Sequence, residues 1–129
     1  MSHLLDTCTL LWMTDNPSQL PQSVQDILSD QNASIFVSAI TALELGLKVA
    51  NRKLQLPQPV SRWFPVVCRR NWMREIPLTA ALATASTELP PLHADPFDRI
   101  LVATALEHDL TILTPDRHVT QYPNLKTLW

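Results

Sequence analysis

The sequence predicts an α/β fold in which a short parallel sheet is covered by helices on both faces. Short apolar segments rich in β-forming residues alternate along the chain with segments whose apolar residues recur at helical spacing. Such alternation is typical of parallel sheets, because each crossover between parallel strands lays a helix on one face. The 129 residues are the usual size of one domain, so we expect a single domain over residues 1–129.

The first half of the chain contains two expected strands. A short buried strand at Leu4-Leu5 ends in Asp6, and a helix follows over 21–30, where apolar residues keep helical spacing. Residues 34–38 are rich in β-formers and predict the second strand. A second helix is expected from about 39 to 51.

The second half begins with a helix from residue 60, which Pro65 is expected to kink or to shift. A weaker strand is expected over 74–78 and an alanine-rich helix over 79–89. The clearest helix spans 95–108. The last two expected elements are strands, at 111–114 and 125–128.

Composition excludes several classes of protein. The chain has one glycine, Gly46, inside a predicted helix, so neither a P-loop nor a dinucleotide-binding glycine motif is possible. Its histidines are dispersed without zinc spacing, and for His93 a loop position without a role is the favoured interpretation. No apolar run reaches the roughly 18 residues of a membrane span, and the first residues lack a signal peptide's pattern. We therefore expect a cytoplasmic protein whose Cys8 and Cys68 are reduced thiols.

The basic residues are concentrated in one region. Seven of the ten lie between positions 48 and 74, where no Asp or Glu occurs, although the net charge is −2. Such a region can bind a polyanion, and Lys48, Arg52 and Arg99 are the candidate contacts with RNA or a protein partner. The alternative interpretation is that these charges are solvated helix faces.

Several carboxylates are expected at one edge of the sheet. Asp6 and Asp116 follow apolar strands, and ligands gather beyond the carboxyl ends of parallel strands. Glu44 shares a helix face with buried positions, and its structural alternative is an ion pair with Lys48. Asp98 also lies on the inward face of its helix, whereas Asp95 is a good N-cap in front of a proline.

Four acids that converge at one edge need a cation to remain ionised together. Asp6, Glu44, Asp98 and Asp116 come from four segments, and their oxygen ligands suit Mg²⁺ or Mn²⁺. Such an ion retains water that can attack a phosphodiester, so no other side chain is needed as nucleophile. The sequence thus predicts a metal-dependent phosphodiesterase site.

Four motifs in order resemble the PIN-domain family, and most closely its VapC-type toxins from bacterial toxin–antitoxin pairs. They are Leu-Leu-Asp6-Thr, Val-Ser-Ala-x-x-x-x-Glu44-x-x-x-Lys48, His93-x-Asp-Pro-Phe-Asp98-Arg-Ile-Leu-Val-Ala-Thr-Ala and Thr-Ile-Leu-Thr-Pro-Asp116. The resemblance covers essentially the whole chain. It implies a three-layer PIN-like fold and a Mg²⁺- or Mn²⁺-dependent ribonuclease, usually a homodimer, silenced by an antitoxin whose tail enters the active site.

The family's acidic quartet falls on Asp6, Glu44, Asp98 and Asp116, and all four are present. Whether Asp95 is a metal ligand or only a cap stays open. Two hypotheses remain: a metal-dependent RNase that acts as a toxin, and a binding protein of the same fold. In the second, the acids hold a structural ion or contact a basic partner segment.

Overall fold

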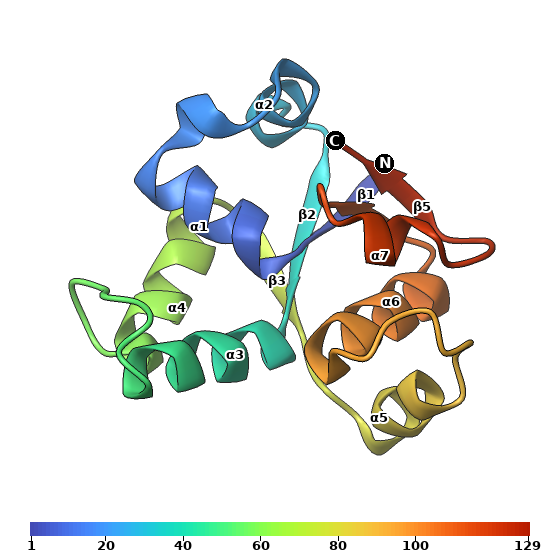
Figure 1. The fold of residues 1–129 in the computed structure, drawn as a ribbon. Coiled ribbons are helices and arrows are strands. Elements are labelled where there is room, and N and C mark those ends of the chain that lie inside the picture. Colours follow the sequence, from blue (N-terminus) through green and yellow to red (C-terminus); the bar gives the residue numbers. More distant parts are fainter.

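The computed structural model describes all 129 residues and contains a parallel sheet between two layers of helices (Figure 1). The strands lie in the order β3-β2-β1-β4-β5, and every neighbouring pair is parallel. Their bounds are β1 Ser2–Leu5, β2 Ser34–Ser38, β3 Met73–Ile76, β4 Thr111–Leu113 and β5 Lys126–Leu128. The predicted fold class is confirmed.

Helices α1, α2 and α4 lie on one side of the sheet and α5 to α7 on the other, while α3 contributes to both cores and contacts both α4 and α6 (Figure 1). The helices are α1 Thr7–Asp15, α2 Gln22–Ser29, α3 Ala39–Ala50, α4 Val60–Arg70, α5 Ala80–Thr87, α6 Pro96–His108 and α7 Arg117–Thr120, with a 3₁₀ turn, η1, at Pro17–Gln19. None of these helices is both long and apolar enough to cross a bilayer.

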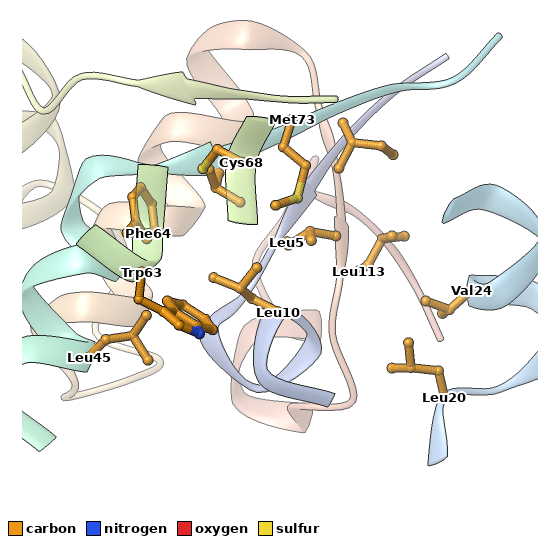
Figure 2. Close-up of a cluster of buried hydrophobic side chains, with 12 residues drawn as sticks. Leu5, Leu10, Leu20, Val24, Leu45, Trp63, Phe64, Cys68, Met73 and Leu113 are labelled. Carbon is orange, nitrogen blue, oxygen red and sulfur yellow. The ribbon is translucent and has the colours of Figure 1, made fainter. Parts of the chain in front are cut away.

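The sheet separates two hydrophobic cores. Successive residues of a strand point to opposite faces, so the fully buried Leu4 and Leu5 belong to different cores. Figure 2 shows the first core, where Leu5 lies among side chains of α1 and α4 such as Leu10 and Trp63. Burying a leucine contributes roughly 1.5–3 kcal/mol. Residues of this kind on both faces make β1 the centre of the fold.

Two helices, α1 and α7, were not predicted from the sequence. Four consecutive apolar residues, 10–13, give α1 no visible helical period, since apolar side chains occur on every side of it. The sequence does contain an N-cap residue for this helix, since the side chain of Asp6 accepts a hydrogen bond from the backbone N–H of Thr9. Helix α7 is only one turn long, and Asp116 caps it in the same way.

The bounds of two elements and the expected effect of Pro65 also need correction. Strand β3 covers Met73–Ile76 rather than 74–78, and α5 covers Ala80–Thr87 rather than 79–89. Pro65 neither shifts the start of α4 nor ends the helix. It removes one backbone N–H to the carbonyl of Ser61, and both residues are exposed, so water can satisfy that carbonyl.

The strand order positions the candidate site. The chain moves from β1 outward to β2 and β3, and then returns to β4 on the other side of β1. The crossovers therefore leave in opposite directions from β1 and β4, which makes this pair the topological switch point. The loops after β1 and β4 carry Asp6 and Asp116.

Candidate active site at the carboxyl edge of the sheet

Asp6 is fixed at the end of β1 by its role as the N-cap of α1. One carboxylate oxygen accepts the backbone N–H of Thr9 at 2.7 Å, and the Thr9 hydroxyl donates to the carbonyl of Leu113 in β4 at 2.7 Å. Burial raises the pKa of Asp6, while hydrogen bonds from Thr114 and Thr9 lower it and the charge of Asp116 raises it further. This carboxylate is rigid, and ionising it is costly.

Asp116 lies beside Asp6 across the switch point, as predicted. It is the N-cap of α7, and its Oδ1 accepts the backbone N–H of His118 at 2.8 Å. Its own backbone N–H donates to the hydroxyl of Thr114 at 3.1 Å. Its Oδ2 lies 3.7 Å from Nε2 of His93. Local capping thus holds one oxygen and leaves the other facing the site.

The two acids of the third motif have the geometry expected of a cap and an inward-facing side chain. Asp95 accepts the backbone N–H of Phe97 at 2.9 Å at the start of α6. Asp98 is 20% exposed, and its Oδ2 lies 2.8 Å from Nε2 of His93. Burial raises the pKa of Asp98 to about 6; the His93 hydrogen bond opposes this rise, and the charges of Asp95 and Asp116 add to it.

His93 lies at the centre of this arrangement, although the sequence favoured a loop histidine without a role. Its ring nitrogen and carboxylate oxygens of Asp95 and Asp98 lie within 4.8 Å of one another, and the same holds for His93, Asp116 and His118. The two imidazoles stack with centroids 4.9 Å apart. The one feature of the sequence that could have indicated a role for His93 is that its loop leads directly into the capped start of α6.

Glu44 lies on α3 and is connected to the site by a hydrogen bond from α1. Its side chain is 15% exposed, and its Oε1 accepts the hydroxyl of Thr7, the residue after Asp6, at 2.6 Å. Its Oε2 lies 3.4 Å from Nζ of Lys48. The predicted inward face and the alternative pair with Lys48 are therefore both present. Neither Glu44 nor Asp6 belongs to the two tight groups around His93.

Arg99 was a candidate RNA contact, and in the structure its guanidinium is engaged inside the protein. Its guanidinium donates to the carbonyls of Ser86, Leu89, Pro90 and His93 and to the Tyr122 hydroxyl, at 2.8–3.1 Å. An arginine side chain has five N–H donors. The six hydrogen bonds come from all three of its nitrogens, so no N–H group is left over. Arg99 instead clamps the loop before α6, which places His93.

The other predicted contacts and the thiols also have defined places. Lys48 is partly exposed beside Glu44, and Arg52 is exposed after the end of α3. Cys8 and Cys68 are both free, as predicted. Burial, with the nearby charge of Asp6, raises the pKa of the Cys8 thiol to about 11, so it is protonated at neutral pH and is a poor nucleophile.

The donor set is suited to a hard divalent cation. Oxygen ligands dominate, and the carboxylate charges that raise the pKa of Asp6 and Asp98 are those that a cation would neutralise. If these acids served only as helix N-caps, Asp98 would not need to point inward beside His93, as it does. The residues present therefore fit Mg²⁺ or Mn²⁺.

A parallel sheet in the order 3-2-1-4-5 with carboxylates at its switch point defines an α/β protein with an acidic site at the carboxyl edge. The chain belongs to the PIN domain family, whose model matches residues 3–125. A relative from Mycobacterium tuberculosis, Ribonuclease VapC22, is 28% identical over 129 residues, which cover 98% of this chain and 97% of that protein.

Solved structures share the fold over almost the whole chain. VapBC2 from Rickettsia felis, bound to a DNA fragment from their promoter, has a TM-score of 0.74 at 19% identity and covers 99% of this chain and 98% of that one. FitAcB from Neisseria gonorrhoeae has a TM-score of 0.62 at 24% identity, with 98% and 96% covered. These likenesses concern the fold alone.

Proposed function

We propose that this chain is a Mg²⁺- or Mn²⁺-dependent endoribonuclease and the toxin of a toxin–antitoxin pair. The relative named as a ribonuclease supports the reaction, since the two proteins align over nearly their full lengths. The observation that carries the proposal is the charge at the carboxyl edge. Three segments carry Asp6, Asp98 and Asp116 to this edge. Burial first, and neighbouring carboxylate charges second, disfavour ionisation of Asp6 and Asp98 and raise the pKa of Asp98 to about 6.

In this proposal Asp6, Glu44, Asp98 and Asp116 hold the ion, and Asp95 acts as the cap of α6. When bound, the ion supplies Lewis-acid activation of water and neutralises charge on the phosphate. The protein supplies rigidity. Capping fixes Asp6 and Asp116, the Thr7 hydroxyl orients Glu44, and the Arg99 clamp holds the loop that places His93.

An antitoxin and a second copy of the chain are the expected protein partners. Structural neighbours described as VapBC complexes support the first. A basic side chain of an antitoxin could take the position that His93 has beside Asp98. For the second, α3 presents the exposed Leu43 and Leu47 one turn apart, with open space around Gly46 between them. Charged substitutions at both leucines should convert a dimer to a monomer in light scattering.

The test is a cleavage assay on a defined RNA, with the new ends mapped by sequencing. We expect cleavage with Mg²⁺ or Mn²⁺ and none in EDTA. Asp6→Asn, Glu44→Gln, Asp98→Asn and Asp116→Asn should each lower the rate by at least about 100-fold, because each removes a charge that holds the ion. The exposed Asp15→Asn serves as the matched control and should cleave like the wild type.

Cleavage that persists in EDTA, or in two of the four variants, would contradict the mechanism. Absence of cleavage by the wild type, combined with metal binding that raises its melting temperature, would instead favour a PIN-fold binding protein with a structural ion. Circular dichroism on every variant separates lost chemistry from lost folding.

A further inference from the structure

Trp72 is a bulky apolar side chain that folding does not explain. It is 89% exposed and follows the C-cap of α4, where its N–H donates to the carbonyl of Arg69 at 3.4 Å. Its φ is 57°, in the left-handed region that glycine usually occupies at this position after a helix. A tryptophan here strains the backbone and leaves the indole in water. Neither effect stabilises the fold, which points to a binding role.

Trp72 lines two adjoining hollows at the amino edge of the sheet, opposite the carboxylates. The first, of about 500 Å³, extends from Trp72 to the exposed amides of Gln31 and Asn71 over a floor that includes Ile35. The second, of about 520 Å³, is lined by Arg69 and Arg74 as well as by Trp72. Gln31 lines both hollows, so the exposed indole has amide side chains in each hollow and guanidinium groups in the second.

The charge around Trp72 is mainly positive. Arg69, Arg70 and Arg74 are exposed, and none of them forms an ion pair. Two acids are near: Asp30 lines the first hollow and accepts the backbone N–H of Asn32 at 2.9 Å, and Glu75 follows Arg74 in β3. The arginines outnumber them, and no acid occurs between positions 48 and 74.

We propose that Trp72 and its arginines form a docking site for single-stranded RNA, separate from the cleavage site. A base stacks on the indole, phosphates contact Arg69 and Arg74, and the amides of Gln31 and Asn71 face base edges. Aromatic platforms beside basic side chains are how proteins hold single strands without strict sequence preference. This inference rests on the proposed action on RNA.

RNA suits this surface better than a peptide. The core of a protein interface needs several adjacent exposed apolar side chains. The apolar residues that line the hollows beside Trp72 are buried or half-buried, whereas its exposed neighbours there are amides, Ser29, Asp30, Arg69 and Arg74. The site also lies at the far end of the strands. Strand β3 begins directly after Trp72, and its four residues span on the order of 13 Å toward the carboxyl edge. An RNA that is cleaved at the acids would therefore also be bound at Trp72, some distance along the RNA from the scissile bond.

The test is fluorescence anisotropy of a labelled 2′-O-methyl oligouridine of 15 nucleotides, titrated with wild-type protein in EDTA, which removes the metal that the proposed cleavage requires. We expect Trp72→Gly to weaken binding about ten-fold and Trp72→Phe to retain most of it. Removing Arg69 and Arg74 together should reduce the magnitude of the slope of log affinity against log salt by about 1.4, because each phosphate contact to a single strand contributes about 0.7. The matched control is Arg62→Ala, an exposed arginine in the first turn of α4.

Stability separates binding from folding, because Trp72→Gly relieves the strained φ and should melt no lower than the wild type. Equal affinities for Trp72→Gly, Arg62→Ala and wild type would overturn the inference, as would no binding by the wild type at low salt. Cleavage with metal is measured separately on long RNA. An active enzyme without this binding contradicts only the docking site, whereas binding without cleavage contradicts only the proposed nuclease.

Discussion

The two edges of the sheet carry opposite charge and are built in opposite ways. At the carboxyl edge, Asp6, Asp98 and Asp116 come from segments far apart in the sequence, and the topology brings them together with limited access to water. At the amino edge, Trp72 and three arginines come from the short segment 69–74 and are exposed.

The two edges therefore differ in their effect on the stability of the folded protein. Crowded, partly buried carboxylates resist ionisation, so the carboxyl edge lowers stability when no cation is bound. Exposed arginines keep their hydration and cost little. Substitutions at the carboxyl edge should therefore change stability as well as chemistry, whereas those at the amino edge should change binding alone.

The largest effect on stability is expected at Arg99, which supports the carboxyl edge without being an acid. Arg99→Ala removes the donors for four carbonyls and a hydroxyl, so the free energy of unfolding should fall by about 2–4 kcal/mol in urea denaturation. Arg99→Lys should recover little, since an ammonium cannot reproduce the planar set of donors. The exposed Arg117→Ala is the control. Wild-type stability in Arg99→Lys would show that the clamp acts only as a charge.

The second prediction tests the cost of the acids directly. In EDTA at pH 7, Asp98→Asn should raise the free energy of unfolding by about 1–2 kcal/mol, less than the full pKa shift implies because the side chain is partly exposed. Between about pH 4 and 6 the folded wild type binds more protons at Asp98 than the unfolded chain does. Its stability should therefore fall as pH rises through this window, and the fall should be smaller in the variant. Urea titrations at four pH values measure both, with Asp15→Asn as control.

A third, smaller effect separates the cap from the ligands. Asp95→Ala removes the hydrogen bond to Phe97 and should lower stability by about 1 kcal/mol, while cleavage stays within a few-fold of the wild type. Thermal melting and the RNA cleavage assay are run on the same preparation, beside Asp98→Asn. A loss of rate as large as that of Asp98→Asn, at an unchanged melting temperature, would mean that Asp95 is a ligand.

Sequence alone located what depends on local pattern. The strand before Asp6, the cap at Asp95 and the inward face of Asp98 all follow from periodicity and capping rules, and the structure has them. Part of what it missed depends on contacts between segments. His93 lies beside the acids in a loop whose carbonyl groups are held by Arg99. Helix α1 was missed for a local reason, because its consecutive apolar residues 10–13 give no helical period.

The smallest effect concerns His3, which breaks the rule that the amino side of the sheet is neutral toward folding. His3 lies in β1, is 2% exposed, and its Nδ1 has no hydrogen-bond partner. Burial, followed by the charge of the N-terminus, lowers its pKa below 6.5.

The unfolded chain therefore binds a proton at His3 near pH 6.5, whereas the folded chain resists it until the pH is lower. Stability from this group is complete above pH 6.5 and is lost as pH falls below that value, by less than about 1.4 kcal/mol per pH unit. Asp98 titrates nearby with the opposite sign, so the measurement is the difference between wild type and His3→Leu from pH 7 to 5, in which the contribution of Asp98 cancels. The variant should lose less stability than the wild type on acidification, and the exposed His108→Gln should not share this behaviour. Parallel curves for wild type and His3→Leu would mean that His3 takes up its proton in the folded sheet as readily as in the unfolded chain.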